Sequence, residues 1–459
     1  MLTLHAVHGL LSSALITLAA CQEAVAAADA QVVQEQKIDA PLLAQLGASG
    51  VLPVAILLKS QFLLGPDGLK DFASQNGSRA RSELRIEVVR TLKQAASTEQ
   101  AAVLEALGSP AAARGLWIAN AIFVSLSAED IRAASAHELV RYIYSMRRAA
   151  PSYDDPGTVS TVLTPAPRPS FSVEDKRIPW NVESIGASGV WDEFAVTGEG
   201  VVVAMIDNGT NYTHPDLTSN MWTNPDEVAN NGVDEDANGL IDDYYGFDFY
   251  RGLAEVQLNP ALGGSAGHGT DVSTMSFSLP DLENIRGLWR LMADHSVAAG
   301  LVMVSGAGNF QQSAPMGMQQ RIPEGIPSVI SVGGVDQALQ LVPFSSLGPV
   351  SWTSVAFYGD HATLTKPDVA AFPGPEYPLI TAEGSGYLDP NTRRGNSFSG
   401  PHATGVAALI LSANPELPAW QVKEIMEQTA RDLSPDGKDD RTGAGLIDAV
   451  AAVREALAR

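Results

Sequence analysis

The sequence predicts a small α+β domain followed by a larger α/β domain, whose doubly wound, mostly parallel sheet carries helices on both faces. Three observations predict this organisation. Residues 1–150 carry 13 basic and 13 acidic side chains, whereas residues 151–459 carry 16 and 39. Residues 151–170 are rich in proline, serine and threonine, which is typical of a linker. Beyond residue 178, short β-rich runs alternate with longer segments, as in a parallel sheet with helical crossovers.

The elements of the small domain follow from local patterns. The apolar run 52–60 predicts a buried strand, and the spacing of Leu84, Val88 and Leu92 predicts a helix over 79–107. Residues 115–126 read as a second strand. Ser127, followed by two acidic residues, predicts the N-cap of a second helix. Residues 140–144 then close the domain as a third strand.

In the larger domain, the β-rich runs 201–206, 301–304 and 329–332 predict parallel strands. Each run is followed within two residues by glycine or asparagine, which favour a turn at the end of a strand. In a doubly wound sheet, functional groups gather at the carboxyl ends of the strands. We therefore expect the functional residues of this domain directly after these runs.

Composition excludes several classes of function. Hydrophobic residues make up 45% of the chain and charged residues 18%, which is typical of a globular protein. The formal net charge of −23 argues against nucleic acid as a partner, because binding to phosphates needs clustered cations. Cys21 is the only cysteine, so an internal disulfide framework and a cysteine-based metal site are both excluded.

The N-terminus predicts export. Residues 10–20 form an apolar stretch of signal-peptide length, and Leu18-Ala19-Ala20-Cys21 resembles a bacterial lipobox. This favours a signal peptide at 1–21 and lipidation of Cys21, with an ordinary secretory signal cut near residues 26–28 as the alternative. We expect an extracellular, periplasmic or outer-membrane location in a bacterium, with contact to a membrane only through a lipid anchor.

Four polar residues of the larger domain have the chemistry of peptide-bond hydrolysis. Asp207 ends the run 201–206, His268 lies in Gly-His-Gly-Thr, and Asn309 follows the run 301–304. Ser397 lies in Gly-Asn-Ser-Phe-Ser-Gly-Pro-His. Hydrolysis by serine needs a hydroxyl nucleophile, a base, a carboxylate that orients the base, and donors for the oxyanion. These residues supply all four.

In this order, the four segments resemble the subtilisin-like serine proteases, the subtilases of peptidase family S8. The resemblance covers roughly residues 178–452. It implies a serine endopeptidase with Ser397 as nucleophile, His268 as general base, Asp207 as the orienting carboxylate and Asn309 as oxyanion donor. The family register favours Ser397 over the nearby Ser399. The order of Asp, His and Ser disfavours a lipase.

The resemblance also implies how the chain is organised. Residues 37–150 resemble the inhibitory propeptide of the family, 151–177 would be the linker, and 178–459 the peptidase domain. The protein would then be a secreted zymogen, with protein or peptide substrates and its own propeptide as an intramolecular inhibitor. We expect a helix to begin near Ser397, with Pro401 in its first turn, where proline is tolerated.

One interval departs from the family. Only 41 residues separate His268 from Asn309, and a helix–strand–helix segment is missing after His268. Two residues between Thr270 and Ser273 cannot supply a parallel crossover. Three readings stay open: an active enzyme that has repacked, a catalytically impaired surface protein that binds without cutting, and a truncated gene product.

An acidic insertion predicts a metal site. Asp234, Asp236 and Asn238, with Gly239 behind them, match the first half of an EF-hand-type calcium loop. Tyr245 stands where the loop would carry glutamate, and Asp242 or Asp243 could substitute, with Asp242 as the predicted ligand. The alternative is a solvated acidic loop. We therefore predict a structural Ca²⁺ and no cofactor for the chemistry.

Overall fold

The computed structural model describes residues 34–47, 50–146, 178–207, 209–249, 253–254, 265–266, 270–280, 282–359, 361–374, 379–380, 384–388, 394–433 and 435–459. The chain divides into two compact units. The first comprises Met1–Phe62 with Arg90–Arg148, and the second Leu63–Val89 with Ala149–Arg459. Residues 63–89 therefore fold with the larger unit, although they lie far upstream of the predicted linker.

The first unit is built on an antiparallel sheet with the strand order β2-β3-β1-β4. Its core is formed by apolar side chains of β1, β3 and β4 together with Val103 of α4 (Arg81–Ala106) and Ile131 of α5. The Ser127 side chain caps α5 by accepting a hydrogen bond from the Asp130 N–H, as the sequence predicts. The elements are β1 (Val51–Leu58), β2 (Arg114–Leu116), β3 (Ala121–Ser127), β4 (Val140–Ser145), α2 (Ala40–Leu43), α5 (Ala128–Ala136) and the short helix η1 (Trp117–Ala119).

The prediction of a single strand over 115–126 is wrong. The segment folds into β2 and β3, which pair with each other on either side of η1. The reversal occurs at Asn120, whose backbone is left-handed with φ = 40°. Asparagine tolerates this conformation better than most residues. Here its side chain also donates hydrogen bonds to the Ser60 carbonyl and to Glu99.

The second unit contains a parallel sheet with the strand order β11-β10-β9-β8-β5, which confirms the predicted α/β fold. The register aligns Ile206 with Met275, and Met275 with Ser305. The carboxyl ends of these neighbouring strands therefore meet at one edge of the sheet. The strands are β5 (Val203–Ile206), β8 (Val272–Met275), β9 (Val302–Gly306), β10 (Ile330–Gly334) and β11 (Val369–Ala371).

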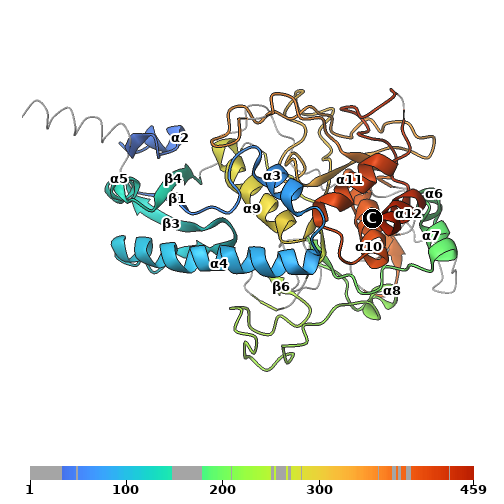
Figure 1. Ribbon diagram of the computed structural model, residues 1–459, viewed down its shortest axis with the longest axis horizontal. Coiled ribbons are helices and arrows are strands. Elements are labelled where there is room, and N and C mark those ends of the chain that lie inside the picture. The colour runs from blue at the N-terminus through green and yellow to red at the C-terminus, as the bar shows by residue number, and fades with distance from the viewer. Residues whose placement is uncertain are drawn as a thin grey trace, which may run out of the picture. The chain divides into compact units, whose positions relative to one another are not determined.

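Helices of the second unit pack on this sheet and on one another. The long helix α10 contacts β8, β9, β10 and β11, and α12 contacts α7, α10 and α11. In Figure 1, α10, α11 and α12 form the group drawn in orange to red. The helices are α3 (Gly68–Asn76), α6 (Trp180–Ser184), α7 (Ala187–Phe194), α8 (Pro215–Thr218), α9 (Arg286–Ala298), α10 (Asn396–Ala413), α11 (Ala419–Thr429), α12 (Ala449–Ala458) and the short η2 (Glu283–Ile285).

Helix α4 (Arg81–Ala106) begins in the second unit and ends in the first. Two further strand pairs of the second unit, β6 (Phe247–Asp248) with β7 (Ser265–Ala266) and β12 (Leu379–Ile380) with β13 (Tyr387–Leu388), are short and antiparallel. Among the described helices, none combines the length and apolar character that a membrane crossing requires.

Strand β5 lies at the edge of the described sheet. It pairs there with β8 alone, and β8 begins two residues after Thr270. The side chains of Val203 and Met205 are each 44% exposed, while Ala204 between them is buried. One face of β5 is therefore packed and the other is open to solvent in the described part of the chain.

Candidate active site

Ser397 is the second residue of α10 and is partly exposed. The start of this helix lies directly on β9, because Gly306 has no side chain. A Cβ atom at residue 306 would lie 2.2 Å from the Asn396 carbonyl oxygen. The helix therefore presents Ser397 at the carboxyl edge of the sheet, with the positive end of its dipole beside the hydroxyl.

Asn309 lies three residues beyond the end of β9 and contacts the same helix start. Its Oδ1 accepts a hydrogen bond of 2.8 Å from the backbone N–H of Asn396. Since an N–H donor requires an oxygen acceptor, this bond makes Nδ2 the donor side of the Asn309 amide. Gly395 leaves room for that amide, because a Cβ there would lie 3.0 Å from Nδ2.

Pro401 lies in the second turn of α10, which corrects the predicted position in the first turn. At this place proline removes the N–H that would bond to the carbonyl of Ser397 in a regular helix. The hydroxyl of Ser276 donates to that carbonyl instead, at 3.2 Å. Ser276 directly follows β8, so this bond ties the residue after β8 to Ser397. No local pattern in the sequence signals this contact.

Ser399 and His402 are buried inside the same helix. The Ser399 hydroxyl has no exposed surface and donates to Asn396 Oδ1. The two ring nitrogens of His402 face the Phe398 carbonyl and the Asn181 amide, each at 2.8 Å. Burial lowers the pKa of His402 to about 4, so the ring is neutral at ordinary pH. Of the two serines, only Ser397 is accessible to a substrate.

Asp207 directly follows β5 and is partly buried at the carboxyl edge of the sheet. Thr270, the first described residue after His268, lies instead at the amino end of β8. His268 itself lies outside the described residues. The structure thus describes three of the four predicted residues, and it brings Asn309 and the Ser397 helix into direct contact.

A buried acid, Glu324, contacts the segment that follows β8. Glu324 has no exposed surface, and its Oε1 accepts hydrogen bonds from the Ser278 hydroxyl at 2.6 Å and from the Arg321 N–H at 3.0 Å. Its Oε2 has no hydrogen-bond partner among the described residues. Burial raises the pKa of Glu324 to about 7, against the effect of these bonds and of the Arg321 charge. Sequence reasoning missed this residue.

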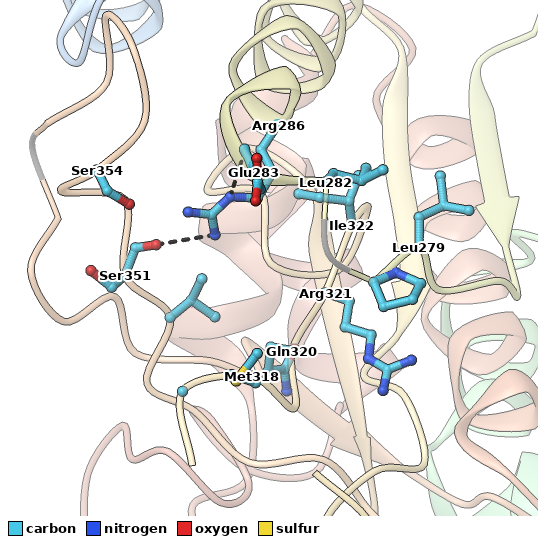
Figure 2. Close-up of a pocket in the computed structure, with 13 residues that line it drawn as sticks. Leu279, Leu282, Glu283, Arg286, Met318, Gln320, Arg321, Ile322, Ser351 and Ser354 are labelled. Carbon is cyan, nitrogen blue, oxygen red and sulfur yellow. Dashed lines mark hydrogen bonds between the residues drawn. The ribbon is translucent and has the colours of Figure 1, made fainter. Parts of the chain in front are cut away.

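A pocket of about 290 Å³ opens beyond Ser278 (Figure 2). Within it, the Leu279 N–H donates to the Ile322 carbonyl at 2.7 Å, and the Arg286 guanidinium donates to the carbonyls of Glu283 and Ser351. Its walls are mainly apolar, with two guanidinium groups. The lining residues are Leu279, Pro280, Leu282, Glu283, Arg286, Gly317, Met318, Gln320, Arg321, Ile322, Val350, Ser351 and Ser354.

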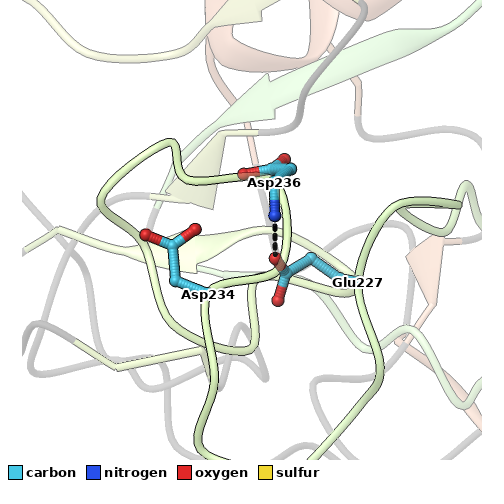
Figure 3. A group of neighbouring side chains, drawn as sticks. All are labelled: Glu227, Asp234 and Asp236. Atoms are coloured by element: carbon cyan, nitrogen blue, oxygen red, sulfur yellow. Dashed lines mark hydrogen bonds between the residues drawn. The ribbon is translucent and has the colours of Figure 1, made fainter.

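The acidic insertion folds into a loop that gathers three carboxylates, those of Glu227, Asp234 and Asp236 (Figure 3). Their nearest oxygen atoms all lie within 4.8 Å of one another. Glu227 is buried, its Oε1 accepts from the backbone N–H groups of Glu235 and Asp236, and its Oε2 has no hydrogen-bond partner among the described residues. Sequence reasoning missed Glu227, because it precedes the recognisable motif.

The other two predicted ligands of this loop make local contacts. Asn238 Oδ1 accepts from the Leu240 N–H at 2.7 Å. The Asp242 carboxylate accepts from the backbone N–H groups of Asn231 and Gly232. The metal site therefore stays a prediction, as does lipidation of Cys21, which lies outside the described residues.

Known proteins resemble part of this chain. Residues 251–445 match the profile of the Subtilase family. Fervidolysin of Fervidobacterium pennivorans is 26% identical over 317 residues, which cover 61% of this chain and 44% of that protein. A probable subtilase-type serine protease of Deinococcus radiodurans is 27% identical over 315 residues, 57% of this chain and 41% of that protein. Subtilisin of Bacillus pumilus is 27% identical over 301 residues, 60% of this chain and 99% of that protein. The match thus spans less than half the length of the first two relatives.

Proposed function

We propose that this chain, which matches the Subtilase family over residues 251–445, is a serine endopeptidase that cuts protein or peptide substrates through an acyl-enzyme. In this proposal the Ser397 hydroxyl attacks the scissile carbonyl and His268 accepts its proton. Asp207 orients and stabilises the protonated imidazole. His268 then returns the proton to the leaving amine, and water releases the acyl group by the same route.

One observation carries the proposal: the contact between Asn309 and the start of α10. Segments 87 residues apart meet there, with Oδ1 of Asn309 bound to the Asn396 N–H. The same contact makes Nδ2 the donor side of the amide, next to the helix that bears Ser397. A donor fixed in advance at this place stabilises charge on a developing oxyanion without reorganisation.

The proposal is tested with a fluorophosphonate probe on the purified full chain, read by mass spectrometry. Serine attack at phosphorus with loss of fluoride leaves a phosphonate ester on an activated serine alone. We expect one adduct, on Ser397, and none in a Ser397→Ala variant. A Ser399→Ala variant is the matched control and should label like the parent. Folded protein that stays unlabelled would favour the catalytically impaired alternative, which binds without cutting.

We also propose that the protein is exported as a precursor, with residues 37–150 acting as an inhibitory propeptide. The signal-like N-terminus supports export, and the separate compact unit Met1–Phe62 with Arg90–Arg148 supports an independent inhibitory part. Mass spectrometry of the exported protein checks both, because lipidation of Cys21 and a cut within 151–177 each give a defined new N-terminus. An uncut, unmodified N-terminus on active protein would contradict both.

We further propose a structural Ca²⁺ bound by Asp234, Asp236 and Glu227. Carboxylate oxygens are the ligands that Ca²⁺ prefers, and a buried Glu227 oxygen with no hydrogen-bond partner among the described residues fits such a role. Isothermal titration of the metal-free chain with Ca²⁺ tests this. We expect saturable binding that Glu227→Gln weakens and Asp226→Asn, one residue earlier, leaves unchanged. Equal binding by both variants would argue for a solvated acidic loop.

A further inference from the structure

Residues 63–89, hereafter the brace, are built into the core of the second unit. Leu84 is only 1% exposed and belongs to the same apolar cluster as Val272 and Val302, which begin β8 and β9. The ring of Phe72 meets that of Trp420 edge to face, with 5.8 Å between centroids. The brace therefore contributes to the interior of this unit, in addition to covering part of its surface.

A buried ion pair fastens the brace to the amino end of β8. Oδ1 of Asp271 lies 2.7 Å from Arg81 Nη1 and 3.0 Å from Arg85 Nη2. The other carboxylate oxygen accepts from the Val202 N–H, directly before β5. The Asp271 side chain is only 9% exposed. Burial would raise the pKa of Asp271, but the Val202 N–H and both arginines together lower it. The carboxylate thus depends on the brace for its charge partners.

Polar contacts along the whole length of the brace also join it to the second unit. The Leu63 N–H donates to Nε2 of His295 on α9 at 3.0 Å, and the Gly77 carbonyl accepts from Gln421 on α11 at 2.8 Å. Both the N–H and the hydroxyl of Ser82 donate to Glu416. These bonds reach α9, α11 and the connection before α11. Releasing the brace would break all of them at once.

We propose that the brace is a permanent part of the second unit, and that the N-terminal chain stays bound to this unit through residues 63–89 after any cut within 151–177. A segment held only at a surface can leave without damage to its partner. Loss of the brace would open a cavity at Leu84 and leave the Asp271 carboxylate buried without its arginines. This proposal does not depend on catalysis, so it can fail or succeed separately from the proposed function.

Hydrogen exchange on the intact full chain gives the first test. We expect the amides of α3 and of residues 84–89 to be as protected as those of β8 and β9, because they open only when this unit unfolds. The amides of β1 and β3 in the first unit should exchange independently. Brace amides that exchange much faster than β8 and β9 would overturn the proposal.

A second test uses cleavage of the full chain carrying Ser397→Ala, with a site-specific protease sequence placed within 151–177. We expect both fragments to co-elute after cutting. Arg81→Gln with Arg85→Gln should lower the unfolding temperature of the second unit by about 10 °C. Arg90→Gln with Arg132→Gln, an exposed pair in the first unit, should leave it unchanged. Separation of the fragments with no loss of thermal stability in residues 178–459 would overturn the proposal.

Discussion

Strands β9 and β5 lie in one parallel sheet and each leads to a predicted catalytic residue, yet their surroundings differ. β9 has β8 and β10 as neighbours and is covered by α10. Val304 in β9 is fully buried, whereas Val203 in β5 is 44% exposed. Asn309 thus takes its position from a filled core, while Asp207 takes its position from a strand paired with one neighbour in the described sheet. In the described sheet, the strand before Asn309 therefore pairs on both sides, whereas the strand before Asp207 pairs on one side.

The largest effect is expected from a substitution on the well-packed side of the sheet. Asp368 is buried, and its carboxylate binds the Ser331 N–H and the ammonium groups of Lys366, Lys423 and Lys438. Despite burial, these cations hold the pKa of Asp368 far below its usual range. Asp368→Asn should destabilise the protein by about 3–5 kcal/mol, because the fully buried Lys366 loses its ion-pair partner. Urea denaturation measures this loss, with the exposed Asp192→Asn as control; equal midpoints for the two variants would contradict the prediction.

The second prediction tests whether Asn309, on the well-packed side of the sheet, acts as the oxyanion donor. Asn309→Ala should lower kcat about 100- to 1000-fold with little change in KM, a range taken from measurements on a subtilisin. Gln312→Ala, an exposed change three residues later, is the control. Steady-state kinetics on a peptide substrate give both constants. A variant that raises KM alone would show that Asn309 binds substrate without stabilising the transition state.

The third prediction concerns pH. The folded-state pKa of Glu324 is raised to about 7, so its contribution to stability is full below about pH 4.5 and is lost as pH rises through 7. Glu324→Gln stays neutral and should gain on the order of 3 kcal/mol relative to the parent between pH 4.5 and pH 8. Urea denaturation across this range measures the difference, with exposed Glu199→Gln as control. Parallel stability curves for parent and variant would refute a protonated Glu324.

The smallest effects are expected from matched valine substitutions in β9 and β5. Val304→Thr buries a hydroxyl in a filled core and should cost about 2 kcal/mol. Val203→Thr keeps the branched shape on an exposed face and should change stability by less than about 0.5 kcal/mol. The urea midpoint of each variant, compared with that of the parent, measures the two effects. Similar losses at both positions would mean that β5 is as tightly packed as β9.

The sequence predicts the elements that local chemistry decides. The apolar runs give the parallel strands, and Ser127 gives the cap of α5. The strand over 115–126 fails because the left-handed conformation at Asn120 is stabilised by distant partners at Ser60 and Glu99. The contact of Ser276 with Ser397 depends on a proline one turn further into α10 than expected. Glu227 joins Asp234 only once the loop closes. Such contacts form only in the folded chain, so periodicity and motif spacing cannot predict them.

The brace also has a consequence for how the chain folds. Its ion pair joins residues 190 positions apart, and the bond from Arg81 to the Pro415 carbonyl joins residues 334 positions apart. A contact of such sequence separation forms only after most of the chain is available, and topologies rich in such contacts fold slowly. During synthesis, residues 63–89 emerge long before β8 and α11 exist. The second unit therefore cannot be completed one segment after another from its N-terminus, because the brace must wait for β8 and for the segment before α11.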